Sequence, residues 1–391
     1  MRKICFITGT RAEYGLLSRL MKMVQDDNSV QLQIIATNMH LSPKFGNTYQ
    51  EIERDGFAID WKIPIIDDNA PDTAQTTVLS LSKAMAGFAN AYNALQPDLI
   101  VILGDRYEML SAASAALIFK IPVAHLYGGE ITEGAYDDAI RHAITKMSHL
   151  HFTSTEVYRQ RVIQMGEQPD RVFYVGAIGV ENAKMVPLMS KEEIEESLSF
   201  KLDKKTVLAT YHPVTNETKV TAEIEREVEN FFEALEETKD LRILFTMPNS
   251  DTGGQMIMNH IKDFVKHNPE RSIAFTSLGM RRYLSVLQFV GGMIGNSSSG
   301  LSEAPAFHIP TLNIGDRQKG RITGNSVVHC DNTKDSILNG LQRIMSPAMQ
   351  EIARTAVNPA EKEGTATLIF EVIKNFPLQN LTQKHFYDLP K

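Results

Sequence analysis

The sequence predicts an α/β protein made of two doubly wound, Rossmann-like domains. Short apolar runs rich in β-branched residues alternate with amphipathic segments, which is typical of parallel strands separated by helices. The alternation stops after Gly179 and begins again near Lys205. A chain of 391 residues is also long for one hydrophobic core. Two domains are therefore expected.

The strands expected in the first domain are apolar on both faces, which indicates burial between two layers of helices. Six such runs occupy residues 3–9, 30–37, 98–105, 121–129, 150–155 and 171–179. Helical patterns lie between them, at 13–25, 76–94, 107–119 and 156–165.

A polar, charged segment at 181–205 is expected to connect the domains. Six more strand-like runs follow, at 205–213, 241–249, 272–279, 290–298, 309–316 and 326–331. We therefore predict a first domain over residues 1–178 and a second over residues 179–357. The remaining residues, 358–391, contain a helix that is a candidate to cross back to the first domain.

Composition argues against several classes of protein. The net charge of −7 disfavours nucleic-acid binding, because a phosphate backbone requires a basic surface. No apolar run reaches the roughly 18 residues of a membrane span, and the N-terminus is interpreted as a strand rather than a signal peptide. The two cysteines, Cys5 and Cys330, lie in apolar runs and suggest no disulfide framework, so a reducing cytoplasm is the expected compartment.

Cofactor signals are weak. His149 and His151 flank Leu150 at the start of an expected strand, His142 lies on the preceding helix, and no Cys or Asp completes a ligand set at standard spacing. We therefore expect no metal. GxGxxG does not follow the first strand, and GxxxxGK[ST] is absent, which disfavours a nicotinamide cofactor and an ATPase.

Polar residues follow seven of the expected strands at their carboxyl ends, the edge at which doubly wound sheets bind ligands. A helix cap explains any one cluster, but seven together predict an active-site cleft between the domains. The clusters lie at 10–13, 105–108, 128–130, 212–213, 249–251, 297–299 and 316–321.

Three serines, Ser297, Ser298 and Ser299, lie where a strand gives way to a helix. The free N–H groups and partial positive charge of a helix N-terminus attract anions, and Gly300 lets a bulky anion approach. The stretch therefore predicts a phosphate or diphosphate cradle, with ordinary N-capping by serine as an equal alternative.

Residues at other strand ends favour the cradle. Several cations suit a diphosphate, and Glu303, one turn further along the helix, is placed to accept hydrogen bonds from ribose hydroxyls. The alternative for Glu303 is stabilisation of the helix dipole. The cationic candidates are Arg11, His212, Arg317 and Arg321.

The motifs GTRAEYG, GDRYE, HLYGGE, DDAIRH, HPVT, GNSSSG and NIGDRQKGR occur in this order. Over residues 4 to about 374, the series resembles the hydrolysing UDP-N-acetylglucosamine 2-epimerases of bacterial sialic-acid biosynthesis. The resemblance implies the GT-B architecture, a homo-oligomer (dimer or tetramer), and no metal or redox cofactor. It implies conversion of UDP-N-acetylglucosamine and water to N-acetylmannosamine and UDP, by anti elimination to 2-acetamidoglucal and then hydration.

The resemblance also implies roles for individual residues. Asp105 and Asp137 are the main acid/base candidates, and Glu130 is a third carboxylate. Asp137 lies four residues before Arg141, so the two side chains share a helix face. The positions expected to contact the substrate are Arg11, Arg106, Tyr127, Arg141, His212, Asn249, Ser297, Ser298, Ser299, Glu303, Arg317 and Arg321.

Tyr127 departs from the family pattern. Many relatives read HIEGGE where this chain reads HLYGGE, so a tyrosine replaces an acid/base glutamate. Our hypothesis is that Glu130 or Asp137 takes over the missing role and that Tyr127 is a weak proton donor or a sugar contact. The stretch TEGAYDD also resembles the legionaminic-acid branch, whose substrate is UDP-N,N′-diacetylbacillosamine.

Two other functions are weaker alternatives. A non-hydrolysing epimerase would carry GTRPE and ExGLRT, where this chain has GTRAE and LYGGEIT. A GT-B glycosyltransferase would explain the phosphate cradle but not the three carboxylates of the first domain.

Overall fold

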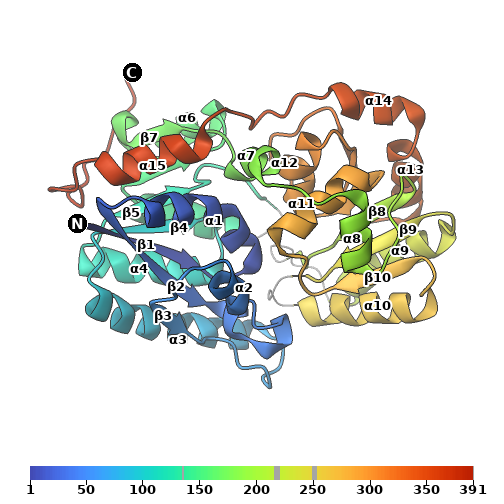
Figure 1. Cartoon of the computed structure of the whole chain (residues 1–391), viewed down its shortest axis with the longest axis horizontal. Coiled ribbons are helices and arrows are strands. Elements are labelled where there is room, and N and C mark those ends of the chain that lie inside the picture. The colour runs from blue at the N-terminus through green and yellow to red at the C-terminus, as the bar shows by residue number, and fades with distance from the viewer. Residues whose placement is uncertain (134–135, 215–220, 249–252, 391) are drawn as a thin grey trace. The chain divides into compact units, whose positions relative to one another are not determined.

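The chain folds into two compact units, each built around one parallel sheet. The computed structural model describes residues 1–133, 136–214, 221–248 and 253–390. Unit 1 consists of Met1–Glu130, Asp137–Asn182 and Ala360–Lys391, and unit 2 of Ile131–Tyr136 and Ala183–Pro359. Both units have helices on the two faces of a parallel sheet, so the predicted doubly wound α/β fold class is confirmed (Figure 1).

Unit 1 contains a seven-stranded sheet in the order β3-β2-β1-β4-β5-β6-β7. Its strands are β1 (Arg2–Thr8), β2 (Val30–Thr37), β3 (Trp61–Ile63), β4 (Leu99–Leu103), β5 (Val123–Leu126), β6 (Leu150–Thr153) and β7 (Val172–Tyr174). Its helices are α1 (Arg11–Asp26), α2 (Tyr49–Arg54), α3 (Ala74–Leu95), α4 (Tyr107–Phe119), α5 (Asp137–Met147), α6 (Glu156–Gln164) and α15 (Thr365–Asn375). Helix α7 (Ile178–Met185) begins in unit 1 and ends in unit 2.

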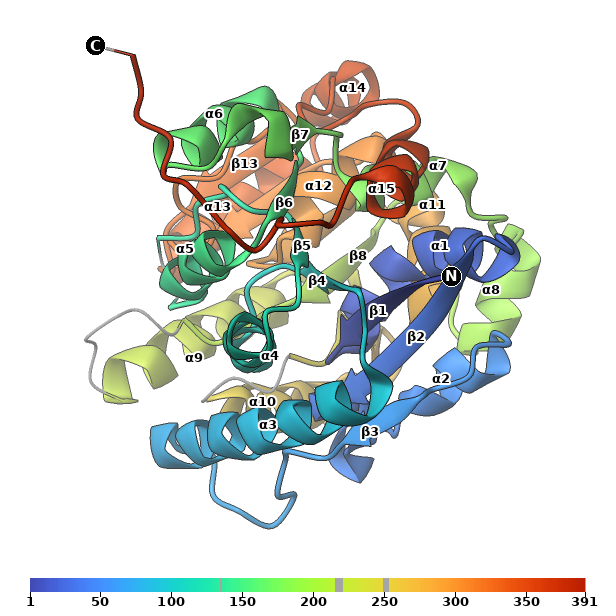
Figure 2. The same cartoon turned by 90° about the vertical axis from the view of Figure 1, so that its left-hand side faces the viewer.

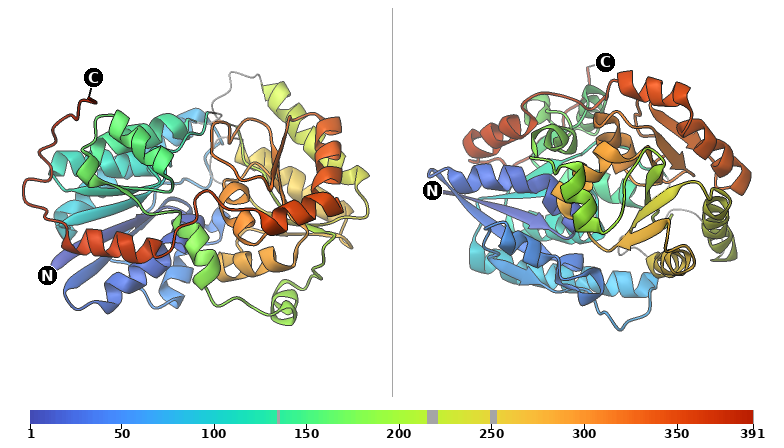
Figure 3. Two further views of the ribbon diagram at one scale, coloured as in Figure 1. Left: turned by 90° about the horizontal axis from the view of Figure 1, so that it is seen from above. Right: turned by 45° about the vertical axis from the view of Figure 1, so that its right-hand side comes forward.

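Different helices cover the two faces of this sheet. Successive residues of a strand point to opposite sides and therefore pack against different helices. Ile4 and Phe6 of β1 pack in one apolar cluster with α1 and α15, whereas Cys5 and Ile7 pack in another with α3, α4 and α5. In Figure 3 the red α15 lies beside the blue N-terminal segment, and an ion pair of 2.6 Å joins Lys374 to Asp27.

Unit 2 contains a six-stranded sheet in the order β10-β9-β8-β11-β12-β13. Alternate residues of β8 again face different layers: Val207 packs with α9, α10 and α13, and Leu208 packs with α8 and α11. The strands are β8 (Thr206–Thr210), β9 (Arg242–Thr246), β10 (Ser272–Phe275), β11 (Gly292–Gly295), β12 (Thr311–Ile314) and β13 (Val327–Cys330). The helices are α8 (Lys191–Leu198), α9 (Thr221–Glu237), α10 (Gly254–His267), α11 (Gly279–Phe289), α12 (Ser299–Ala306), α13 (Lys334–Ile344) and α14 (Pro347–Thr355).

Several elements differ from the sequence-based expectation. Strand β3 was not predicted, because Lys62 interrupts its short apolar run and Pro64 follows directly, and it pairs with β2 at the sheet edge. The expected connector forms α7 and α8. The last helix, expected to begin near residue 358, begins at Thr365. Gly364, directly before it, has a φ of 72°, which is not a helical conformation. Asn358 instead donates a hydrogen bond from Nδ2 to the Ser302 carbonyl. Within the described residues, no helix has the length and apolarity needed to cross a membrane.

The carboxyl end of β11 depends on Gly295. Its φ of 124° lies in the region that favours glycine, and a Cβ atom there would lie 1.9 Å from the Thr210 carbonyl oxygen of β8. Gly295 and Thr210 are register partners, so the two strands approach closely just before the serine-rich stretch.

We predict that Gly295→Ala destabilises unit 2 by more than the ~1–2 kcal/mol that a left-handed backbone alone costs an L-residue. Gly56→Ala is the matched control, because Gly56 has a φ of 87° but a Cβ there would meet no atom within 4 Å. Differential scanning calorimetry of the two variants measures the difference. Equal shifts in Tm would contradict the steric argument.

Candidate active site

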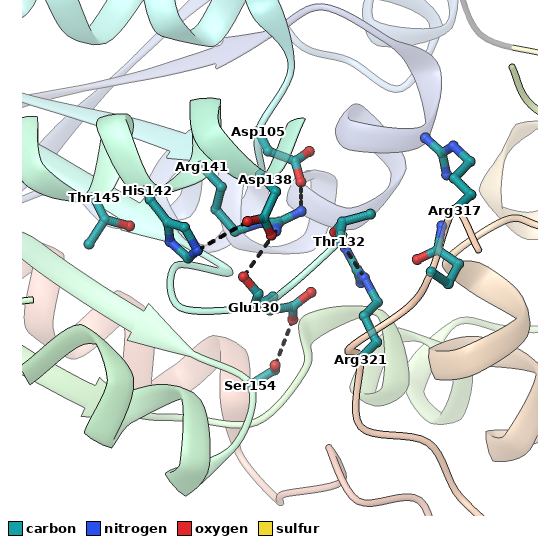
Figure 4. A network of polar contacts seen from close by, with 12 residues as sticks. Asp105, Glu130, Thr132, Asp138, Arg141, His142, Thr145, Ser154, Arg317 and Arg321 are labelled. Atoms are coloured by element: carbon teal, nitrogen blue, oxygen red, sulfur yellow. Dashed lines mark hydrogen bonds and ion pairs between the residues drawn. The ribbon is translucent and has the colours of Figure 1, made fainter. Parts of the chain in front are cut away.

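Arg141 of α5 organises the candidate site of unit 1. Its guanidinium, 1% exposed, forms an ion pair with Asp105, which follows β4 (Figure 4). Its Nη1 also donates to the Glu130 carbonyl at 3.0 Å and to Asp138 Oδ1 at 3.3 Å. One buried cation therefore joins the ends of β4 and β5 to α5, and it places Asp105 next to the backbone of Glu130.

The other two predicted carboxylates, Glu130 and Asp137, are also buried. Glu130 follows β5, and its Oε1 accepts a hydrogen bond of 2.7 Å from the Ser154 hydroxyl at the end of β6. Asp137 is the first residue of α5 and lies one helical turn before Arg141. Three carboxylates from three segments of unit 1 thus accompany one arginine.

His125 of β5 supports the turn that carries Asp105. Its Nε2 bonds to the Gly104 carbonyl at 2.7 Å, and its Nδ1 bonds to Thr145 Oγ1 at 3.2 Å. Burial lowers the pKa of His125 to about 3, so the ring is neutral, with Nε2 as the donor and Nδ1 as the acceptor. Sequence reasoning included this residue as the first of the HLYGGE motif but gave it no role, because a histidine in an apolar run carries no specific functional signal.

Arg106 lies against a pair of buried acids. Its Nε is 3.0 Å from Glu108 Oε1 and 4.0 Å from Glu13 Oε1. Glu13 Oε2 accepts hydrogen bonds from the N–H groups of Gly9 (2.8 Å) and Thr10 (3.1 Å). Burial and the charge of Glu108 raise the pKa of Glu13 to about 8, although Arg106 acts in the opposite direction.

This acid pair requires the glycine at position 9. A Cβ atom there would lie 2.1 Å from Glu108 Oε1, so any side chain would displace the carboxylate. Sequence reasoning noted both glutamates only as members of strand-end clusters, because their proximity follows from the pairing of β1 with β4.

Tyr127 and Arg11 complete the predicted residues of unit 1. The Tyr127 hydroxyl accepts a hydrogen bond of 3.2 Å from the Gly179 N–H, and its ring packs against the cluster that contains α1 and α15. Its backbone has a φ of 68°. Arg11 is half-buried and is the first residue of α1.

Asn296 organises the strand ends of unit 2. It is fully buried, and its side chain forms two hydrogen bonds with the backbone of His212: Oδ1 accepts from the N–H at 2.7 Å, and Nδ2 donates to the carbonyl at 2.9 Å. Its own carbonyl accepts from Arg317 Nη1 at 3.2 Å and from Gln318 Nε2 at 2.9 Å. The predicted residues His212 and Arg317 are therefore tied to one another through Asn296.

Sequence reasoning missed Asn296 and Gln318. Gln318 lies inside the strand-end cluster at 316–321 and Asn296 directly precedes the one at 297–299, but amides carry no charge and did not suggest a role in anion binding. Asn249 lies outside the described residues.

The serines begin helix α12. Ser298 is the N-cap residue but makes no side-chain capping bond, whereas Ser297 Oγ accepts a hydrogen bond of 3.4 Å from the Ser299 N–H. Ser299 Oγ lies 2.5 Å from the hydroxyl of Tyr283. Further along α12, burial raises the pKa of Glu303, and Ser302 donates to its carboxylate at 2.5 Å.

Arg321 binds a segment that comes from the first half of the chain. Its Nε and Nη2 lie 3.4 and 3.3 Å from the Thr132 hydroxyl (Figure 4), and the Glu133 N–H donates to the Lys319 carbonyl at 3.1 Å. Thr132 and Glu133 therefore pack as part of unit 2. Among the residues that the structure describes, no three His, Cys, Asp or Glu side chains gather closely enough to hold a metal ion.

Comparison with known proteins identifies a family. The model described as UDP-N-acetylglucosamine 2-epimerase matches residues 22–374. The chain is 41% identical over 389 residues to the Campylobacter jejuni protein named GDP/UDP-N,N′-diacetylbacillosamine 2-epimerase (hydrolyzing), with 99% of both chains covered. It is 38% identical over 394 residues to polysialic acid biosynthesis protein P7 of Escherichia coli, with 100% of this chain and 98% of that protein covered.

The fold is also shared with a solved structure. The UDP-GlcNAc 2-epimerase of Neisseria meningitidis bound to UDP-GlcNAc gives a TM-score of 0.77 at 17% identity, with 95% of this chain and 100% of that chain covered. The family match contains six of the seven strand-end clusters, all but residues 10–13, and the two relatives extend over both units. The chain therefore belongs to the UDP-N-acetylglucosamine 2-epimerase family, and within it to the hydrolysing UDP-sugar 2-epimerases.

Proposed function

We propose that this chain cleaves a UDP-linked 2-acetamido sugar with water, releasing UDP and a free sugar inverted at C2. The observation that carries the proposal is the cluster in which buried Arg141 holds Asp105 and the Glu130 backbone, in a chain of this family. The proposed chemistry requires carboxylates, an anion-binding group and water.

The proposed reaction has two steps. First, the C1–O bond breaks and its electron pair leaves with UDP, while a carboxylate removes the proton from C2. This anti elimination gives a 2-acetamidoglucal with a C1–C2 double bond. Water then adds its hydroxyl to C1, and an acid returns a proton to the opposite face of C2. Because the C2 proton is weakly acidic, C1–O cleavage must run ahead and build positive charge on the ring.

Unit 1 is proposed to supply the proton transfers. Asp105 and Asp137 are the main acid/base candidates, and the contacts of Arg141 give Asp105 a fixed orientation. Glu130 is the candidate to replace the glutamate that is absent at position 127, since its carboxylate is buried and held by Ser154. The Tyr127 hydroxyl interacts with the Gly179 amide, which favours a supporting role over proton transfer.

Unit 2 is proposed to hold the nucleotide. Negative charge develops on the diphosphate as it leaves, and cations together with a helix N-terminus stabilise it. His212 and Arg317, joined through Asn296, and the serines at the start of α12 are the groups proposed for this task. Glu303 is the proposed ribose contact. Further proposed contacts to the substrate are Arg11, Arg106, Asn249 and Arg321.

Two sugars are candidates. UDP-N,N′-diacetylbacillosamine comes first, because the Campylobacter jejuni relative named for it is 41% identical over nearly the whole chain. UDP-N-acetylglucosamine, the precursor of N-acetylmannosamine, comes second, because the relative at 38% identity is named for polysialic acid biosynthesis. The first relative's name also includes GDP, so the nucleotide requires its own test.

We predict that one of these UDP-sugars, incubated with the protein in heavy water, yields free UDP and a manno-configured sugar carrying deuterium at C2. NMR of the product identifies the sugar and the deuterated carbon, and the matching GDP-sugar tests the nucleotide. A product still linked to UDP would instead indicate a non-hydrolysing epimerase. No turnover without an added acceptor would favour a glycosyltransferase.

We predict that Asp105→Asn and Glu130→Gln each lower kcat by roughly 100-fold or more, the usual contribution of a general acid or base. UDP binding, measured by calorimetry, should persist, because the residues proposed to hold the diphosphate belong mainly to unit 2. Tyr127→Phe should keep most of the turnover, since the Tyr127 hydroxyl is engaged with the backbone N–H of Gly179. The reverse pattern, with Glu130→Gln active and Tyr127→Phe inactive, would transfer the role to Tyr127.

The buried pair of Glu13 and Glu108 beside Arg106 is expected to make the stability of the protein depend on pH. Since the pKa of Glu13 is raised from its ordinary value of 4.5 to about 8, the folded protein keeps a proton that the unfolded chain releases in this range. Glu13 therefore lowers the free energy of unfolding progressively as pH rises from about 4.5 to about 8. Glutamine at this position still accepts the N–H bonds of Gly9 and Thr10 but does not titrate.

We expect the Tm of Glu13→Gln minus the Tm of the wild type to be higher at pH 8 than at pH 5. Thermal unfolding at both pH values measures this difference. Glu363→Gln, which changes an exposed glutamate, is the control and should show no such trend. A constant difference between Glu13→Gln and wild type would contradict the buried acid pair.

A further inference from the structure

The turn that leads from β5 to Glu130 packs directly against helix α6. This helix lies beside β6 and β7 at the edge of the unit 1 sheet (Figure 2). Gly129 in the turn has a φ of 80°, and a Cβ atom there would lie 2.5 Å from the Tyr158 carbonyl oxygen and 2.9 Å from Val162 Cγ2, both in α6. The turn and the backbone of α6 therefore touch with no room for a side chain between them.

Two arginines from different helices hold successive carbonyl groups of this turn. Arg161 of α6 donates from Nη1 to the Gly129 carbonyl, and Arg141 of α5 donates from Nη1 to the Glu130 carbonyl at 3.0 Å. The buried ring of Tyr158 has its centroid 5.3 Å from the Arg161 guanidinium carbon, a cation–π contact that keeps this arginine beside the turn. Because charged donors form stronger hydrogen bonds than neutral ones, both carbonyls are firmly held.

The carboxylate of Glu130 is held by the residue just before α6. Ser154 Oγ donates to Glu130 Oε1 at 2.7 Å (Figure 4). Thr155, the next residue, is the N-cap of α6, and its hydroxyl accepts a hydrogen bond of 3.2 Å from the Tyr158 N–H. The start of α6 is thus fixed at the place where Ser154 meets Glu130. One short segment, from Ser154 to Arg161, therefore contacts both the backbone of the turn and the carboxylate that the turn carries.

We propose that Arg161 and Ser154 are positioning residues for Glu130. The inference rests on the proposed function, in which Glu130 takes part in proton transfer. Arg161 fixes the backbone from which the Glu130 side chain projects, and Ser154 fixes the direction of its carboxylate. Neither residue has to touch the substrate. A proton moves only over a hydrogen-bond distance, and a displacement of about 1 Å can lower a rate by roughly 100-fold.

A purely structural role for Arg161 is the alternative, and Arg159 of the same helix provides the comparison. Arg159 donates from Nε to the Val172 carbonyl at 2.8 Å and from Nη2 to the Pro169 carbonyl at 3.2 Å. Both carbonyls belong to the segment at 169–172, not to the turn that carries Glu130. Loss of Arg159 should therefore affect stability alone, whereas loss of Arg161 should also lower turnover.

The test is steady-state kinetics of the full chain with the UDP-sugar that the wild type hydrolyses, together with the Tm of each variant. Arg161→Met and Ser154→Ala should each lower kcat by roughly 10- to 100-fold with little change in KM. Arg161→Lys keeps a charged donor and should recover most of kcat. Arg159→Met and Ser111→Ala are the matched controls and should keep the wild-type kcat. Ser111 is a buried serine of unit 1 that donates to the Leu81 carbonyl at 3.1 Å.

A double variant tests whether Arg161 acts through Glu130. In a Glu130→Gln background, Arg161→Met should cause no further loss of kcat, because the group that Arg161 positions is already gone. The same fold-loss in both backgrounds would overturn the proposal. Ser154→Ala removes a single hydroxyl and can be put through the same cycle, so the proposal stays testable even if Arg161→Met does not fold.

The remaining outcomes separate this role from the proposed function. An unchanged kcat in Arg161→Met and Ser154→Ala, or an equal loss of kcat in Arg159→Met, would overturn the positioning role while the proposed reaction stands. A fully active Glu130→Gln would do the same. A wild type that releases UDP from neither sugar would overturn the proposed function, and this role with it.

Discussion

The buried guanidinium of Arg141 is the constraint on which the candidate site of unit 1 depends. A charge inside a protein is tolerated only when opposite charges and acceptors surround it, because desolvation costs several kcal/mol per ion. The acceptors come from separate segments: Asp105 after β4, the Glu130 carbonyl after β5, and Asp138 on α5 itself. Satisfying one side chain therefore fixes the positions of several carboxylate-bearing turns at once.

In unit 2 a neutral side chain, that of Asn296, holds the strand ends together. The Asn296 amide is fully buried, and both its polar atoms are paired with the backbone of His212, while its carbonyl receives Arg317 and Gln318. The neutral Asn296 amide adds no negative charge beside Arg317, whereas a carboxylate at this place would add one. This difference accords with proton transfer in unit 1 and anion binding in unit 2.

The sequence was informative where one residue type carries the signal. Apolar runs predicted all six strands of unit 2, and charged residues after strands indicated Asp105 and Arg317, whereas Arg141 was indicated only by the family resemblance. It was uninformative where function depends on contacts between strands: Glu13 and Glu108 meet only because β1 pairs with β4 and because residue 9 has no side chain. Strand β3 was missed because Lys62 interrupts its three residues and Pro64 follows directly, whereas the equally short β7 lies within the longer apolar run at 171–179.

The sequence periodicity of helix α4 does not reveal its contacts. Its first turn carries Glu108 toward Arg106 and Gly9, and its middle packs against the sheet. Its last turn exposes Leu117 and Ile118. Because these three regions meet three different surroundings, the helix shows no simple amphipathic stripe. Each turn of α4 is therefore explained by its own contacts, and within the described residues the side chains of Leu117 and Ile118 in the last turn stay exposed.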